Sequence, residues 1–335
     1  MNGKYEPTPL PSREGNYSAS ASCEVPPPGG ARGGSVAGRA GSPLPAAPAH
    51  QRNQSQPDSA HAVTRPAFRI GNQTAFSARS VLEPFEFALA NRFTAFEFFP
   101  DRGPAGVGGW AEQDLDDTTR RWIRQTARDM GIELTVHAPL EFNPLNDPED
   151  QRLYTTVAFA RDIGATLVNL HLEMGHGVEG FVTALRPTLL LTAEANLNLA
   201  IENTVWTGPD DFNACFTVLS ERSEVDASHA GMCFDLGHAN LFGALQNNYW
   251  AYLDALSAKV PIIHLHLHEN FGDRDSHLPL FTGPSHDSSA GLAGFVERLH
   301  RRAFNGCAIL EQWPQPHTLL VDARNRLAEL LPSRG

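Results

Sequence analysis

The stretch that decides the fold is residues 165–203, ATLVNLHLEMGHGVEGFVTALRPTLLLTAEANLNLAIEN. Its two ends, ATLVNLH and NLAIEN, are short apolar runs that finish on polar residues, and a longer helical segment separates them. Two such runs joined by a helix are typical of a strand–helix–strand unit with parallel strands. The stretch therefore predicts one repeat of an α/β fold.

Similar short runs recur on both sides of this unit. The predicted strands are FRIGNQ (68–73), FTAFEFF (93–99), IELTVH (132–137), ATLVNLH (165–171), NLAIEN (198–203), GMCFDL (231–236), IIHLHL (262–267) and CAILEQ (307–312). Eight strands in about 270 residues match the usual size of a (β/α)8 barrel. A doubly wound open sheet uses the same alternation, but its Gly-x-Gly-x-x-Gly turn is missing after the first strand. We therefore predict a (β/α)8 TIM barrel over residues 66–335.

The clearest helix boundaries lie around residues 147–164. Asp147 is a suitable N-cap, Pro148 suits the first helical position, and Gly164 stands where the helix should end. Three apolar residues at helical spacing form its predicted buried face: Leu153, Val157 and Ala160.

Residues 1–65 have a different composition, dominated by Pro, Gly, Ala and Ser. Such a segment buries too little apolar surface to offset the entropy of an ordered chain. We expect a disordered N-terminal tail. A stretch translated from a misassigned start codon is the alternative interpretation.

Charge and cysteine usage narrow the class of function. The net charge is −12, and because residues 1–65 carry six Lys/Arg and four Asp/Glu, the remainder carries −14. The acidic charge therefore disfavours nucleic-acid binding, since phosphate affinity rests on Lys and Arg. The four cysteines form no C-x-x-C pair, and no apolar run is long enough to span a bilayer. We expect a cytoplasmic protein with no membrane partner.

Residues of the kind that bind metals recur at or near the ends of successive predicted strands. They are His137, His171, Glu202, Asp235, His266 and Glu311. In a barrel the strand ends converge on one mouth, so these residues would meet around a single pocket. A lone histidine there is more often a hydrogen-bonded core residue, but three carboxylates buried together need a cation or a hydrogen-bond network. Imidazoles with carboxylates suit a divalent ion such as zinc or manganese.

The motifs around these residues resemble the xylose isomerase-like TIM-barrel superfamily, which contains sugar and sugar-phosphate isomerases and epimerases and the endonuclease IV type of apurinic-site nuclease. The matching motifs are VHAP at His137, VNLH at His171, IEN at Glu202, CFDLGH at Asp235 and His238, HLHEN at His266, DSH at Asp275 and His277, and ILE at Glu311. Their order and spacing carry the resemblance, which covers nearly all of residues 66–330.

The resemblance implies a ligand set and a reaction. In the isomerase and epimerase branches the positions of Glu202, Asp235, His266 and Glu311 hold one divalent metal, and in the nuclease branch all nine positions hold three zinc ions. Glu202 and Glu311 then become the candidates for moving a proton through an enediolate of a sugar or sugar phosphate. The predicted substrate contacts are His137, His171, Glu97 and His268; His137 and His171 could instead bind further metal.

The sequence departs from the family pattern at two places, and the first of them bears on the choice of branch. Where the nucleases have a tyrosine after HAP, this chain has Leu140, and LFTGPSHDSS at 280–289 replaces the compact Gly-x-Gly turn of either branch. We therefore predict a metal-dependent isomerase or epimerase with a small carbohydrate substrate. A multinuclear zinc phosphodiesterase, a lyase or dehydratase, and a binding protein without activity remain as alternatives, and a homo-oligomer is compatible with all of them.

Overall fold

The computed structural model describes residues 68–102, 109–222, 226–243 and 248–331. The tail predicted for residues 1–65 lies outside these described residues.

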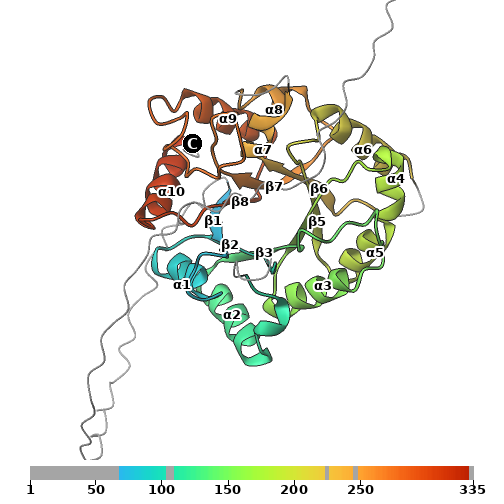
Figure 1. Ribbon diagram of the computed structural model, residues 1–335, viewed down its shortest axis with the longest axis horizontal. Coiled ribbons are helices and arrows are strands. Elements are labelled where there is room, and N and C mark those ends of the chain that lie inside the picture. Colours follow the sequence, from blue (N-terminus) through green and yellow to red (C-terminus); the bar gives the residue numbers. More distant parts are fainter. Residues whose placement is uncertain (1–67, 103–108, 223–225, 244–247, 332–335) are drawn as a thin grey trace, which may run out of the picture. The chain divides into compact units, whose positions relative to one another are not determined.

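Eight parallel strands form a closed barrel in which neighbours in sequence are neighbours in space, and β8 pairs with β1 (Figure 1). The strands are β1 (Arg69–Gln73), β2 (Ala95–Phe98), β3 (Glu133–His137), β4 (Leu167–His171), β5 (Asn198–Glu202), β6 (Ala230–Asp235), β7 (Ile262–Leu267) and β8 (Cys307–Leu310). All eight predicted strands are present, with boundaries shifted by at most two residues. The TIM-barrel prediction is confirmed, and closure of the sheet excludes the doubly wound alternative.

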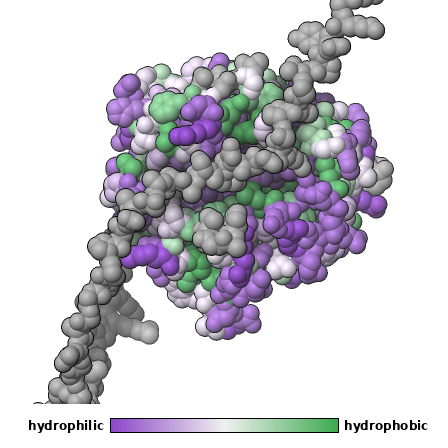
Figure 2. Space-filling model, viewed as in Figure 1, coloured by the Kyte–Doolittle hydropathy of each residue, from purple (hydrophilic) through white to green (hydrophobic). Residues whose placement is uncertain are grey.

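Helices surround the strands, as Figure 1 shows. They are α1 (Glu83–Ala90), α2 (Asp117–Met130), α3 (Gln151–Ile163), α4 (Gly177–Ala184), α5 (Arg186–Glu194), α6 (Pro209–Glu221), α7 (Leu236–Leu241), α8 (Ala251–Ala255), α9 (Ala290–Arg301) and α10 (Thr318–Leu330), with a short 3-10 turn at Glu112–Asp114. Figure 2 shows hydrophilic side chains over α2, at the bottom of the view. Within the described ranges, no helix has the length and apolar character needed to cross a membrane.

The alternation of side chains along each strand separates two environments. In β5, Leu199 and Ile201 join the large core that includes the surrounding helices, whereas Ala200 packs with Leu167 and Cys233. Because successive strand residues face opposite sides of a sheet, Glu202 follows Ala200 on the inner side. The barrel interior therefore passes from small apolar residues to polar ones toward the carboxyl ends of the strands.

Aromatic packing fixes β2 between its neighbouring helices. Phe85 of α1 contacts Phe96 and Phe98 of β2, with ring centroids 5.1 Å and 5.6 Å apart, and Phe98 also contacts Phe159 of α3 at 5.7 Å. Burying each phenyl ring stabilises the fold by roughly 1.5–3 kcal/mol. The residue between Phe96 and Phe98 is Glu97, which must therefore face the opposite way, into the barrel.

Helix α3 corrects one prediction. It begins at Gln151, with Asp150 rather than Asp147 as its N-cap, and Asp150 accepts a hydrogen bond from the Arg152 backbone N–H at 2.9 Å. Asp147 makes the same kind of turn earlier, through the Glu149 N–H at 3.0 Å, so Pro148 lies in a turn before the helix. The predicted end is confirmed, since Gly164 has φ +76°, and so is the buried face: Leu153, Val157 and Ala160.

Candidate metal centre

The structure brings the strand-end residues together at one end of the barrel. Four of them are the last residues of consecutive strands: His137 of β3, His171 of β4, Glu202 of β5 and Asp235 of β6. His266 is the penultimate residue of β7, and Glu311 directly follows β8. Strand register aligns them, because His171 pairs with Glu202 and Asp235 pairs with His266. The site lies where active sites of TIM barrels are found.

Four of these side chains form the most compact group. Glu202, Asp235, His266 and Glu311 each offer a ligand atom, and these atoms all lie within 4.8 Å of one another. Nδ1 of His266 lies 3.2 Å from Oε2 of Glu202 and 3.0 Å from Oε1 of Glu311. All four side chains are at most 8% exposed. The group is a buried set of three carboxylates and one imidazole.

Glu202 is the most connected member of this group. Its Oε2 lies 3.2 Å from Nε2 of His137, and its Oε1 lies 3.6 Å from Nε2 of His171 and 3.5 Å from Nδ1 of His238. The amide of Asn169 also donates to Oε2 of Glu202. Asn169 was not among the predicted site residues. The available signal was its place two residues before His171 on the same inward face of the strand.

Asp235 joins the strand to the next helix. Its Oδ1 accepts the backbone N–H of His238 at 2.6 Å, which makes Asp235 the N-cap of α7. Asn203 holds the Asp235 backbone through two hydrogen bonds. Its Oδ1 accepts the Asp235 N–H at 2.8 Å, and its Nδ2 donates to the Asp235 C=O at 3.0 Å. Asn203, also missed by the sequence analysis, thus fixes the direction in which Asp235 faces.

A second group lies beside the first. It consists of His238, His268, Asp275 and His277, whose ligand atoms also lie within 4.8 Å of one another. Asp275 Oδ2 lies 3.3 Å from Nε2 of His238 and 3.2 Å from Nε2 of His277. The two groups meet because Nε2 of His268 lies 3.2 Å from Oδ1 of Asp235. His268, predicted as a substrate contact, therefore lies within this second group.

Gly237 permits this arrangement. A Cβ atom at position 237 would lie 1.9 Å from Cε1 of the His268 ring, closer than any real contact. The same ring stacks on His277, with centroids 3.9 Å apart and planes 11° apart. The stacked ring leaves no room for a side chain at position 237, so packing favours the Gly in the CFDLGH motif.

The electrostatics of the first group favour charged side chains. Burial alone would raise the pKa of Glu202, but His266 and His171 outweigh burial and hold it well below its ordinary value. His266 likewise outweighs burial at Glu311 and lowers the pKa of that carboxyl to about 2. Burial lowers the pKa of the His266 imidazole, but the carboxylates of Glu202, Glu311 and Glu97 more than reverse this effect. Glu202 and Glu311 are thus carboxylates at neutral pH.

The donor atoms fit a divalent cation. Nδ1 of His266 is fully buried and makes no hydrogen bond, although two carboxylate oxygens lie within 3.2 Å of it. Donor atoms that converge in this way, without aligning on one another, suit a shared ion. The mixture of imidazole and carboxylate suits zinc, manganese, iron or cobalt. The Nδ1 atom of His268 in the second group is also buried without a hydrogen bond.

Glu97 lies beneath the first group. It is fully buried, and its two oxygens lie 2.8 Å from Nε2 of His264 and 2.8 Å from Nε2 of His266. Burial would raise the pKa of this carboxyl, but His266 and His264 outweigh burial and lower it. Both oxygens therefore face protein groups. His171, whose side chain is 20% exposed, is more open to a ligand than His137, which is 4% exposed.

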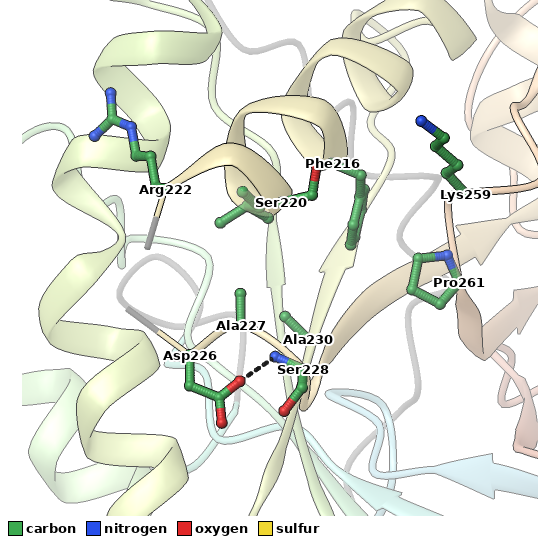
Figure 3. A pocket seen from close by; sticks show the side chains of 10 residues that line it. Phe216, Ser220, Arg222, Asp226, Ala227, Ser228, Ala230, Lys259 and Pro261 are labelled. Carbon is green, nitrogen blue, oxygen red and sulfur yellow. Dashed lines mark hydrogen bonds between the residues drawn. The ribbon is translucent and has the colours of Figure 1, made fainter. Parts of the chain in front are cut away.

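A separate cavity of about 350 Å³ lies at the opposite ends of the strands, near the starts of β6 and β7 (Figure 3). Its lining includes Phe216 of α6, Ala230, Lys259 and Pro261. Asp226, its one carboxylate among the lining residues, accepts the backbone N–H of Ser228 at 2.9 Å, as the dashed line shows. None of the predicted site residues lines this cavity. The strand-end residues of the candidate metal centre lie at the carboxyl ends of the strands instead.

Comparisons with known proteins agree with this fold. A D-tagatose 3-epimerase-like protein is similar in structure, with a TM-score of 0.60 and 18% identity over 78% of this chain and 97% of that chain. A xylose isomerase domain protein from Planctomyces limnophilus has a TM-score of 0.57 and 14% identity over 79% of this chain and 97% of that chain. A D-psicose 3-epimerase solved with D-fructose has a TM-score of 0.53 and 14% identity over 78% of this chain and 98% of that chain. No curated protein matches in sequence. The family model described as xylose isomerase-like TIM barrel matches residues 85–330, so the chain belongs to that family.

Proposed function

We propose that this protein is a divalent-metal-dependent isomerase or epimerase that acts on a sugar or sugar phosphate through an enediolate. One observation carries the proposal. Two buried carboxylates, Glu202 and Glu311, approach Nδ1 of the same imidazole, that of His266, at 3.2 Å and 3.0 Å. Family membership and the epimerases among the similar structures support a carbohydrate substrate.

The proposed metal ligands are Glu202, Asp235, His266 and Glu311. A divalent ion bound there supplies a Lewis acid for the oxygens of an α-hydroxy carbonyl compound. The favoured ions are zinc and manganese, because the donor set mixes one imidazole with three carboxylates.

The carboxylates of Glu202 and Glu311 are the proposed proton carriers. Each has a pKa below its ordinary value and is therefore ionised at neutral pH, as a group that accepts a proton from the carbon next to a carbonyl must be. Removal of a proton by one and its return by the other at the opposite face gives epimerisation. Delivery to the neighbouring carbon gives isomerisation of an aldose and a ketose.

The two imidazoles beside Glu202 have proposed roles in binding. His171 is partly exposed and close to Oε1 of Glu202, so it is placed to donate a hydrogen bond to a substrate hydroxyl. His137 is buried and contacts Oε2 of Glu202, which suits a role in holding that carboxylate. The proposal includes a reducing cytoplasmic location, with which the unpaired Cys215, Cys233 and Cys307 agree.

Proton exchange with solvent tests this proposal without knowledge of the product. The protein is loaded with zinc or manganese and incubated with a panel of ketoses, aldoses and their phosphates in deuterium oxide. Deuterium at the carbon next to the carbonyl, detected by NMR, is the expected result for at least one compound. Absence of exchange across the panel in metal-loaded protein would contradict the assignment. Loss of a hydroxyl in the labelled product would instead identify a lyase or dehydratase.

A multinuclear zinc phosphodiesterase is the second candidate, and one observation favours it. The group His238, His268, Asp275 and His277 provides donors for a further ion beside the first. Against it stand the net charge of −12, unfavourable for DNA, and Leu140, which is 45% exposed in the loop after β3. Cleavage of a duplex with an abasic site by zinc-loaded protein would establish this alternative.

A further inference from the structure

Glu97 of β2 is held rigidly inside the barrel. Its Oε2 accepts a hydrogen bond from Oγ1 of Thr135 on β3 at 2.9 Å and one from Nε2 of His264 on β7 at 2.8 Å. All three residues are at most 1% exposed. Two donors on one oxygen fix the carboxylate plane and leave Oε1 for another partner.

That partner is His266. Oε1 of Glu97 lies 2.8 Å from Nε2 of the ring, close enough for a hydrogen bond after a small rotation, and neither atom has another hydrogen-bond partner. Nδ1 lies near Glu202 and Glu311 on the other side. The two ring nitrogens therefore face different carboxylates. Nδ1 is the ring nitrogen that lies close to two members of the four-residue group, Glu202 and Glu311.

A purely structural role would not explain this placement. A buried carboxylate is costly to desolvate, and the two hydrogen bonds from Thr135 and His264 already serve its Oε2. Its remaining oxygen approaches the one imidazole of the candidate metal centre. Metal-binding histidines commonly use their second ring nitrogen to donate to a carboxylate, which fixes the tautomer and the ring orientation.

We propose that Glu97 is a positioning residue for the metal centre: it holds the proton of His266 on Nε2 and so makes Nδ1 the ligating atom. The inference rests on the proposed metal centre. It also gives Glu97 a role other than the substrate contact expected from sequence, because the substrate would lie on the far side of the His266 ring.

Metal affinity and histidine NMR test the proposal in the full chain. Glu97→Gln keeps the side-chain volume, but its amide cannot accept hydrogen bonds at both ends. Zinc affinity, measured by competition with a chelator, is expected to fall ~10–100-fold. The matched control is Glu133→Gln, the same replacement at the start of β3, where Glu133 pairs with Arg69 away from the metal centre. This control is expected to retain the zinc affinity of the unaltered protein. Loaded with cobalt, it is also expected to give the absorption spectrum of the cobalt-loaded unaltered protein.

The ring nitrogens of His266 give a readout that needs no variant. In zinc-loaded unaltered protein labelled with nitrogen-15, we expect a metal-bound Nδ1 and a protonated Nε2. Ligation through Nε2, or equal zinc affinity and cobalt spectra for Glu97→Gln and the unaltered protein, would overturn the inference while leaving the metal centre intact. Failure of the unaltered protein to bind metal would overturn both proposals together.

Discussion

Replacing Glu311 by Gln tests the two roles proposed for that residue. The carboxamide has nearly the same volume as the carboxylate, but it lacks the charge that faces Nδ1 of His266 at 3.0 Å. Four-ligand zinc sites in small domains bind with about 10–16 kcal/mol, so one ligand contributes about 3 kcal/mol, or ~100-fold in affinity. At saturating metal, loss of a proton carrier should slow deuterium exchange ~10²–10⁴-fold.

The same change should leave the fold intact. His266 keeps its contacts with Glu202 and Glu97, and a volume-conserving replacement usually costs less than about 1.5 kcal/mol. Thermal unfolding of the metal-free protein checks this expectation. Glu133→Gln is the matched control, because Glu133 begins β3 at the other end of the barrel and pairs with Arg69. Exchange within tenfold of the unaltered rate at saturating metal would refute the role of Glu311.

Three further predictions address the surroundings of the site. Gly237→Ala should destabilise the protein by roughly 1–3 kcal/mol in denaturant titrations, because the new Cβ overlaps the His268 ring; unchanged stability would contradict the packing. Zinc affinity should rise as the pH is raised above 6.5: burial opposes protonation of His266, but Glu202 and Glu311 outweigh burial and raise its pKa, and the proton must leave before metal binds. A pH-independent affinity would exclude His266 as a ligand. Trp206, 80% exposed in the loop after β5, should stack on substrate, so Trp206→Ala should raise KM and leave metal content unchanged; an unaltered KM would contradict this role.

The fold could be predicted because its signals are local. Each strand is a short apolar run followed by a helical segment, and the six strands from β3 to β8 each end near a residue such as Glu202 or Asp235. Closure of the sheet then brings these residues together, so their proximity follows from the topology. The beginning of α3 was harder to predict, because Asp147 and Asp150 both cap local turns and the sequence does not rank them.

The contacts across the barrel could not be predicted. Glu97 and His264 are 167 residues apart in sequence, and no local pattern relates them. The sequence shows that residues 280–289 differ from the family's Gly-x-Gly turn, but it does not show which contacts hold this segment in place. Glu269, fully buried, accepts the backbone N–H groups of Gly283 and Ser285, each at 3.1 Å, and the hydroxyl of Tyr249 at 2.6 Å. One side chain thus holds this loop where a glycine turn was expected.

Metal content of the purified, zinc- or manganese-reconstituted protein, measured by elemental analysis, tests the central claim most directly. The comparison is with the double variant Glu202→Gln, Asp235→Asn, which keeps the volume of both side chains. We predict about one divalent ion per chain in the unaltered protein and its loss in the variant. Three zinc ions per chain would favour the phosphodiesterase, and no bound metal in either protein would contradict the proposed metal centre.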